Sequence, residues 1–235
     1  MIRSLPLLLL VGCVTETGNP ELDVHMAVSG ASSDERVTID HVPSVTIDAA
    51  YTVLDDVRLV QGDACDAPGE VEFDAEGPFA IDLLAAEPFV VDIPAATGDY
   101  CRLRVRMDRA DGAPDGLPAG MDDHAVYIEG RRVDHTPFVI RSRERFEVDL
   151  RSSGAPFPLD TGTDRLVLAF DLGVWLADID LDSGTPGGDG VLRIDEDYES
   201  GLLEAFEARV EEVMSLHDDR DGDGSAGYDD PTLAD

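Results

Sequence analysis

The chain has 235 residues, and its 51 acidic residues outnumber 17 basic residues, all of them arginine, so that the formal net charge is -34. This balance excludes a nucleic-acid-binding protein, because phosphate recognition needs a basic surface, and it argues against a face that lies on anionic lipid. Such a surface favours cations. Its carboxylates either keep the protein soluble through charge repulsion between molecules or bind specific ions.

The first residues end in Leu10-Val11-Gly12-Cys13, which resembles a bacterial lipobox at the end of a short apolar run. The run is too short to cross a membrane, which takes about 20 apolar residues. We therefore interpret residues 1–12 as a lipoprotein signal peptide and Cys13 as the lipid-modified, palmitate-bearing residue. An ordinary signal peptide with an accidental cysteine is the alternative.

Residues 13–23 then form a tether that links the membrane to the folded part. Val14 stands where inner-membrane lipoproteins of enteric bacteria carry aspartate, so the resemblance favours an outer-membrane location. Whether the protein faces the periplasm or the cell surface stays open.

Two cysteines remain once Cys13 is assigned to lipid. An even pair in an oxidising compartment predicts a disulfide between Cys65 and Cys101. Neither cysteine lies in a CxxC motif, which argues against metal binding by this pair.

Residues 24–182 read as one short β-strand after another, with turn residues between them. Cys101–Met107 shows the pattern most clearly, because apolar residues alternate there with Arg102, Arg104 and Arg106. Such alternation is typical of an antiparallel strand with one face in water. The fold class we predict is mainly β, an antiparallel β-sandwich.

Five short blocks of this region resemble, in order, the blocks of an uncharacterised β-sandwich domain family of bacterial surface lipoproteins. The blocks are Ile81–Ala85, Ile93–Tyr100, Arg102–Val105, Pro137–Ile140 and Ala169–Asp171. In that family a leucine-rich strand precedes an I-P-A-G-x-Y turn, whereas Ala96 and Thr97 lengthen the turn here. The resemblance implies a transthyretin-like or immunoglobulin-like sandwich without an established activity, and it transfers no catalytic residue.

Residues 183–235 change character and predict a C-terminal amphipathic helix followed by an acidic loop. Ser200 is a suitable N-cap, and apolar residues recur at helical spacing over about 17 residues. These residues are Leu203, Phe206, Val210 and Val213. We expect their side chains to pack on the sandwich.

The acidic loop, Asp219–Asp230, resembles the calcium loop of EF-hand and dockerin-type sites. In that register Asp219, Asp221 and Asp223 supply carboxylates, and a glycine at the sixth position allows a sharp turn. Ser225 would offer a backbone carbonyl, Gly227 a water and Asp230 the closing carboxylate. Aspartate replaces the usual long glutamate at the end, so we expect a weak Ca²⁺ site. The alternative is a disordered acidic tail.

A poorer acidic segment spans residues 178–196, and whether it binds a second ion stays open. Asp189–Glu196 resembles the second half of a calcium loop, but the first ligand positions fall on Thr185 and Gly187. Asp178, Asp180 and Asp182 would have to fold back to replace them.

Leu159–Thr163 matches the active-site turn of aspartic proteases, in which paired aspartates activate water. The sequence holds one copy, so catalysis by Asp160 would need a homodimer. A polar hairpin is the simpler interpretation.

The sequence as a whole predicts a lipid-anchored, extracytoplasmic structural or binding module with a weak Ca²⁺ site and without catalysis. The membrane, through Cys13, is its expected partner, and a surface protein or glycan is a possible further one. A dimeric aspartic peptidase centred on Asp160 is one alternative function. A surface polysaccharide-binding protein is the other, since β-sandwiches host many functions.

Overall fold

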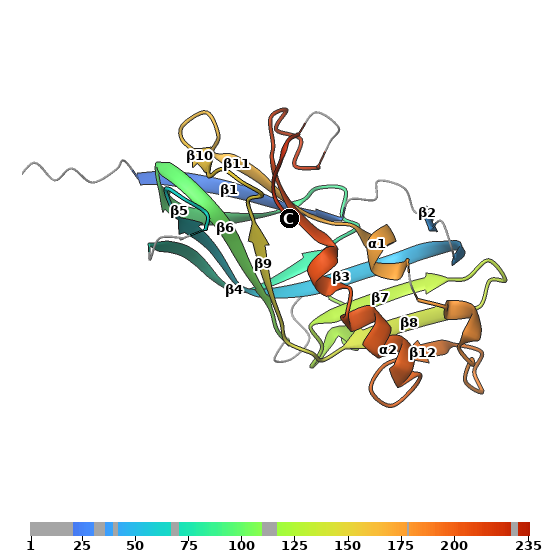
Figure 1. The fold of residues 1–235 in the computed structure, drawn as a ribbon. Coiled ribbons are helices and arrows are strands. Elements are labelled where there is room, and N and C mark those ends of the chain that lie inside the picture. Colours follow the sequence, from blue (N-terminus) through green and yellow to red (C-terminus); the bar gives the residue numbers. More distant parts are fainter. Residues whose placement is uncertain are drawn as a thin grey trace, which may run out of the picture.

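The computed structural model describes residues 21–30, 36–39, 42–66, 71–109, 117–177, 179–226 and 230–235. These residues form a mainly β fold with short helices, as the sequence predicts (Figure 1). The strands are β1 Glu21–Gly30, β2 Arg36–Ile39, β3 Val42–Gln61, β4 Glu72–Asp82, β5 Phe89–Ala96, β6 Gly98–Met107, β7 Val126–Arg131, β8 Pro137–Ser142, β9 Phe146–Arg151, β10 Phe157–Leu159, β11 Arg165–Phe170, β12 Leu192–Ile194, β13 Met214–Asp218 and β14 Thr232–Ala234. The helices are α1 Leu172–Leu176 and α2 Ser200–Glu207, with single turns η1 Ala119–Met121, η2 Leu181–Ser183 and η3 Val210–Glu212.

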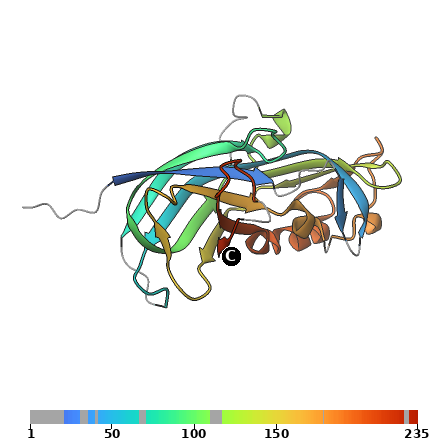
Figure 2. The ribbon, with the colours of Figure 1, turned by 90° about the horizontal axis from the view of Figure 1, so that it is seen from above.

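The strands form two sheets. One is five-stranded in the order β14-β13-β11-β1-β5, and the other is nine-stranded along the path β10-β6-β3-β7-β8-β12, with β2 and β4 beside β3 and β9 beside β6. The long β3 holds the second sheet together, because its first half pairs with β7 and its second half with β4 and β6. Register shifts along β3 bend it, and the sheet curves into a half-barrel (Figure 2).

Both sheets are mixed, which differs from the purely antiparallel sandwich expected from the sequence. Strand β1 pairs with β11 in parallel, and so do β12 and β8. The partners in each parallel pair lie far apart in the chain, so no tight hairpin dictates their relative direction. The alternation of apolar and polar residues along a strand indicates which face of the strand is buried. It does not indicate whether the neighbouring strand runs parallel or antiparallel.

Strand β6 confirms the alternation predicted for Cys101–Met107. Cys101, Leu103, Val105 and Met107 are buried, and the three arginines between them lie on the outer face. The buried side joins a continuous apolar core between the two sheets. The other side carries a row of partly exposed arginine side chains.

The C-terminal helix is shorter than predicted. Helix α2 ends at Glu207, a single 3-10 turn follows, and the chain then enters strand β13. Strand β13 pairs with β11 over five residues, so the chain leaves the helix before the end of the apolar stripe. Val210 lies in the 3-10 turn, and Val213 directly precedes β13. Glu199 occupies the N-cap in a left-handed conformation, and Ser200 is the first helical residue rather than the cap.

Helix α2 packs on the sheets as expected. Phe206 is fully buried, and its ring stacks on that of Trp175 in α1 with centroids 4.8 Å apart. Within the described part of the chain, the helices are too short or too polar to cross a membrane.

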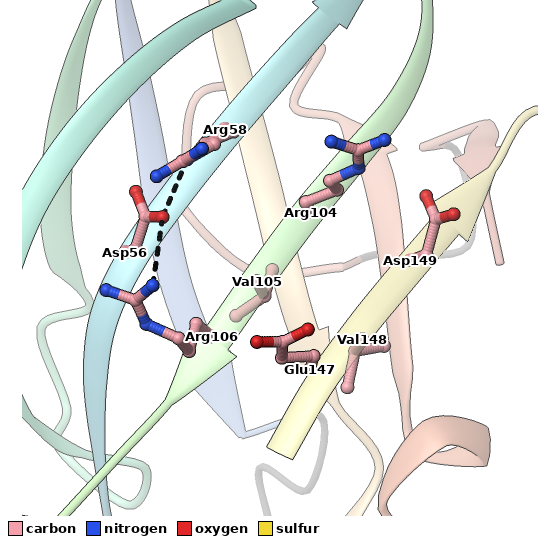
Figure 3. Close-up of a pocket in the computed structure, with 8 residues that line it drawn as sticks. All are labelled: Asp56, Arg58, Arg104, Val105, Arg106, Glu147, Val148 and Asp149. Carbon is pink, nitrogen blue, oxygen red and sulfur yellow. Dashed lines mark ion pairs between the residues drawn. The ribbon is translucent and has the colours of Figure 1, made fainter. Parts of the chain in front are cut away.

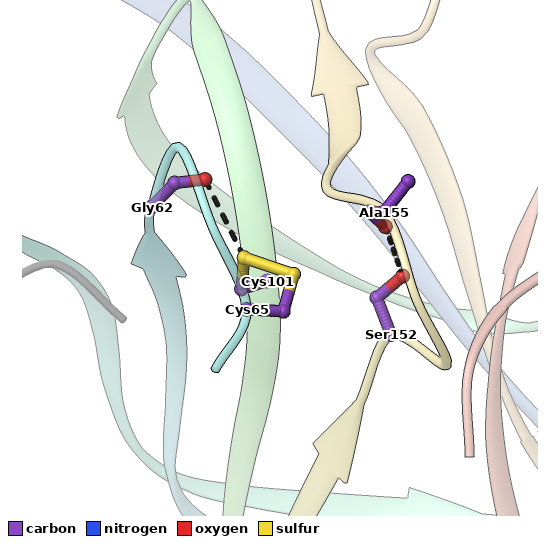
Figure 4. Close-up of a disulfide and its surroundings, with 5 residues drawn as sticks. All are labelled: Gly62, Cys65, Cys101, Ser152 and Ala155. Atoms are coloured by element: carbon purple, nitrogen blue, oxygen red, sulfur yellow. Dashed lines mark hydrogen bonds between the residues drawn. A yellow bond between two sulfur atoms is a disulfide. The ribbon is translucent and has the colours of Figure 1, made fainter. Parts of the chain in front are cut away.

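Cys65 and Cys101 form the predicted disulfide, with Cα atoms 5.1 Å apart (Figure 4). The bond ties the turn after β3 to the first half of β6. The amide of Gly62 donates a hydrogen bond to the Asp99 carbonyl at 3.0 Å, so the same turn is also held by its backbone.

Candidate metal centre

The acidic loop connects strands β13 and β14, which pair with each other in antiparallel fashion. Its ends are fixed by backbone hydrogen bonds. The amide of Asp218 donates to the Pro231 carbonyl at 3.1 Å, and that of Asp219 donates to the Arg165 carbonyl at 3.2 Å. The sequence places a helix directly before this loop, but the structure places a strand there, so a sheet rather than a helix pair supports the candidate site.

Three of the predicted ligands converge. One carboxylate oxygen from each of Asp219, Asp221 and Asp223 lies within 4.8 Å of the other two. Two oxygens bound to one Ca²⁺ at about 2.3–2.6 Å are separated by at most about 5 Å, so one ion can contact all three side chains. Asp219 is buried, whereas Asp221 and Asp223 are exposed, which leaves the group open to an ion from solvent.

The loop reaches this conformation through its own amide donors and two glycines. The Asp219 carboxylate accepts a hydrogen bond from the Gly222 amide at 2.8 Å, and the Asp221 carboxylate accepts one from the Asp223 amide at 3.1 Å. Gly222 and Gly224 both have φ of 74°, a left-handed conformation that favours glycine. The glycine predicted at the sixth loop position is therefore placed where the turn requires it.

Gly224 also sets how closely the loop approaches the sheet. A Cβ atom at this position would lie 2.5 Å from Cγ of Pro88 and 3.4 Å from Cβ of Ala27 in β1. A larger residue would push the loop away from the five-stranded sheet.

The carboxylates of the group differ in their electrostatics. Burial raises the pKa of Asp219, and the amides of Gly222 and Gly224 oppose this shift by donating hydrogen bonds. The charges of Asp230 and Asp221 raise the same pKa further. A divalent cation would remove that repulsion and favour the charged carboxylate, so ion binding and deprotonation of Asp219 are linked.

Ser225 and Asp230 contact the loop in different ways. Ser225 donates from its hydroxyl and its amide to Asp223, at 2.6 and 2.8 Å, and these bonds lower the pKa of Asp223. The Asp230 side chain is buried and accepts a hydrogen bond from the Arg220 amide at 3.1 Å. Asp230 thus closes the loop structurally, outside the three-carboxylate group. Gly227 lies outside the described residues.

The donor set suits a hard cation. All the converging atoms are carboxylate oxygens, which Ca²⁺ and Mg²⁺ prefer, while zinc and copper sites use nitrogen and sulfur ligands. Among the described residues, this is the one group of histidine, cysteine, aspartate or glutamate side chains with metal-ligand spacing.

The acidic segment 178–196 uses its carboxylates differently. Asp189 forms a two-point ion pair with Arg193 at 2.5 and 3.0 Å, and this pairing lowers the pKa of Asp189. Asp195 is buried and pairs with Arg141 from β8. Asp182 lies 3.4 Å from Arg132, and Asp178 is outside the described residues. Asp182, Asp189 and Asp195 are therefore ion-pair partners of arginine. Glu196 accepts a hydrogen bond from the Arg143 amide at 3.0 Å, and Asp180 precedes the η2 turn without joining a carboxylate cluster among the described residues.

Asp160 lies at the exposed turn between β10 and β11. Its carboxylate accepts a hydrogen bond from the Gly162 amide at 2.6 Å, and its amide donates to the Thr163 hydroxyl at 3.0 Å. The Thr163 hydroxyl donates in turn to the Pro158 carbonyl at 2.9 Å. These bonds make a compact polar turn, which differs from the predicted hairpin because β10 pairs with β6 and β11 pairs with β1 and β13 in the other sheet. Cys13, the predicted lipid site, lies outside the described residues.

The structure also contains a cluster of charged side chains that was not predicted from the sequence. The outer face of β3, β6 and β9 forms a pocket of about 310 Å³ that combines arginines with carboxylates (Figure 3). Alternation placed the arginines of β6 on a solvent-facing side. The carboxylates around them, such as Asp56 and Glu147, come from strands whose pairing the sequence does not reveal.

Comparison with known proteins returns one weak structural similarity. MbnP from Methylosinus trichosporium superimposes with a TM-score of 0.41 and 12% sequence identity, over 73% of this chain and 82% of that chain. No family model and no curated protein matches the sequence. A similarity at this level says nothing about a shared function.

Proposed function

We propose that the chain is an extracytoplasmic binding module, anchored to the outer membrane by lipid on Cys13, whose C-terminal loop holds Ca²⁺. The observation that carries the calcium part is the convergence of Asp219, Asp221 and Asp223 around a turn with glycine at its sixth position. The order of the sequence blocks supports a sandwich of the kind found in bacterial surface lipoproteins. The role is one of binding or structure, without catalysis.

The location is supported by two independent features. The Leu10–Cys13 motif has the composition that lipoprotein processing requires. The Cys65–Cys101 disulfide is of a kind that persists in oxidising compartments and is rare in the cytosol. Extracellular calcium modules typically bind at about 10⁻⁴–10⁻³ M, so a weak site is usable outside the cell.

Calcium is expected to raise the melting temperature of the purified protein. With a dissociation constant of about 1 mM, 10 mM Ca²⁺ adds about 1.4 kcal/mol, or about 3–6 °C for a chain of this size. The ion neutralises repulsion between the clustered carboxylates. Differential scanning calorimetry in Ca²⁺, in Mg²⁺ of equal concentration and in chelator measures the effect.

The double variant Asp221→Ala/Asp223→Ala is expected to lose the calcium shift. Its matched control is Asp63→Ala/Asp66→Ala, which removes the same charge from exposed positions near the disulfide. The quantity compared is the shift between Ca²⁺ and chelator, since removing charge also changes the baseline stability. Equal shifts in both double variants, or no shift in the parent, would contradict a calcium site.

The lipid anchor is tested separately in a Gram-negative host. A palmitate analogue fed to the cells is expected to label the parent and to leave Cys13→Ala unlabelled, with the variant moving from the membrane to the soluble fraction. Cys65→Ser serves as the control and should keep its label. Label on Cys13→Ala, or none on the parent, would remove the anchor from the proposal.

A further inference from the structure

The outer face of the half-barrel carries a pocket that shares no residue with the calcium loop. It is lined by Asp56 and Arg58 from β3, Arg104 and Arg106 from β6, and Glu147 and Asp149 from β9, together with Val105 and Val148. The volume, about 310 Å³, lies at the lower end of the range of small-molecule sites. Figure 3 shows the polar side chains projecting from three neighbouring strands.

Strand pairing places these side chains in two rows across the sheet. In one row Asp56, Arg106 and Glu147 are cross-strand neighbours, and in the next Arg58, Arg104 and Asp149 are. Two arginines directly opposite each other repel. Here Arg58 and Arg104 are both held by Glu72 of β4, at 3.5 and 2.8 Å. The sheet thus keeps two guanidinium groups side by side at a fixed position.

The other anchors are equally firm. The Asp56 side chain is only 7% exposed, and its carboxylate lies 2.6 Å from Nε of Arg58. Arg106 donates to Asp55 through Nε at 2.7 Å and also through Nη2. Side chains fixed in this way lose little entropy when a ligand binds, so the pocket is preorganised.

Hydrogen-bonding capacity remains inside this fixed frame. Arg104 uses Nη1 toward Glu72, and its side chain is 43% exposed. Glu147 is exposed and forms no ion pair within the described chain. Asp56 and Asp149 each also keep one oxygen without a hydrogen-bond donor among the described residues, but these two oxygens are buried, so Arg104 and Glu147 are the groups open to a ligand.

The charges of the pocket cancel, although the chain as a whole is strongly acidic. An anion would meet Asp56, Glu147 and Asp149, and a cation would meet three guanidinium groups. A hydroxyl group can bind both the arginines and the carboxylates of the lining, because it donates one hydrogen bond and accepts two. We propose that this pocket binds the hydroxyl groups of an uncharged saccharide. The inference rests on the proposed binding module and supplies its ligand class.

The lining contains no aromatic ring, so hydrogen bonds rather than stacking provide the affinity. A single pocket of this kind should bind a free sugar with a dissociation constant on the order of 1 mM. Several copies of the protein on one membrane would engage a polymer through many such contacts.

The test uses the full chain, purified in a detergent without a sugar headgroup. Saturation-transfer NMR is recorded with glucose, galactose, mannose and N-acetylglucosamine, and with glucuronic acid and glucosamine as charged probes. At least one neutral sugar is expected to bind more tightly than both charged probes. Binding of both charged probes at least as tightly, or of no neutral sugar, would overturn the proposal.

Two variants locate the site. Arg104→Met and Glu147→Gln are each expected to weaken binding of that sugar about tenfold, since each removes a charged hydrogen-bonding group. The control is Arg131→Met on β7, an arginine that is 56% exposed with one ion pair to Asp48. Equal weakening in the control, or unchanged binding in both pocket variants, would refute the pocket as the site.

A titration in chelator separates this inference from the calcium proposal. The pocket and the calcium loop share no residue, so the sugar should bind equally with and without Ca²⁺. A melting-temperature shift in Ca²⁺ without sugar binding would refute the saccharide proposal and leave the calcium site in place. Sugar binding without a melting-temperature shift in Ca²⁺ would refute the calcium site and leave the saccharide proposal in place.

Discussion

Replacing Phe206 with alanine is expected to lower the free energy of unfolding by about 3–5 kcal/mol. The ring is fully buried and stacks on Trp175 at 4.8 Å with an interplanar angle of 10°. Its removal leaves a cavity where α2 meets α1, and the surrounding helices relax only in part. Equilibrium unfolding in urea, followed by tryptophan fluorescence, measures the loss, since Trp175 is the single tryptophan of the chain.

Glu204→Ala provides the control on the same helix. Glu204 is exposed, and alanine is a strong helix former, so this change should alter stability by no more than about 0.5 kcal/mol. A loss below about 1 kcal/mol for Phe206→Ala would show that α2 does not pack on α1 in solution.

Removing the disulfide is expected to lower the free energy of unfolding by about 3–4 kcal/mol. The bond closes a loop with a sequence separation of 36, and without it the unfolded chain regains the entropy of that loop. Urea unfolding of Cys65→Ala, Cys101→Ala and the double variant measures the effect.

The three cysteine variants also test the pairing itself. Either single variant breaks the same bond, so each should lose nearly as much as the double variant. The fully buried Cys101 adds a small packing loss of its own. Additive losses from the two single variants would mean that these cysteines are not bonded to each other.

Features set by local chemistry were predictable from the sequence. Alternation in Cys101–Met107 identified the buried face of β6, and setting Cys13 aside left the pair that forms the disulfide. The spacing of Asp219, Asp221 and Asp223 around Gly224 likewise anticipated a loop that gathers carboxylates. Each of these signals comes either from residues a few positions apart in the sequence or from the number of cysteines.

Features set by distant partners were not predictable. The apolar stripe after Ser200 continues through Val213, but pairing of β13 with β11 ends the helix early. The parallel neighbours of β1 and β8 are chosen by topology, which period-two patterns do not encode. The pocket on β3, β6 and β9 needs the register of three strands before its charges can be seen to balance.

The position of β1 bears on how the protein would carry mechanical load. This strand lies between β11 and β5 and forms a ladder with each of them. Residues 13–20 join it directly to Cys13, the proposed point of membrane attachment. A pull from the membrane along β1 would strain both ladders in shear, so many hydrogen bonds must break together rather than one after another. The strand nearest the anchor is thus placed to resist extraction, and the rate of forced unfolding should be low.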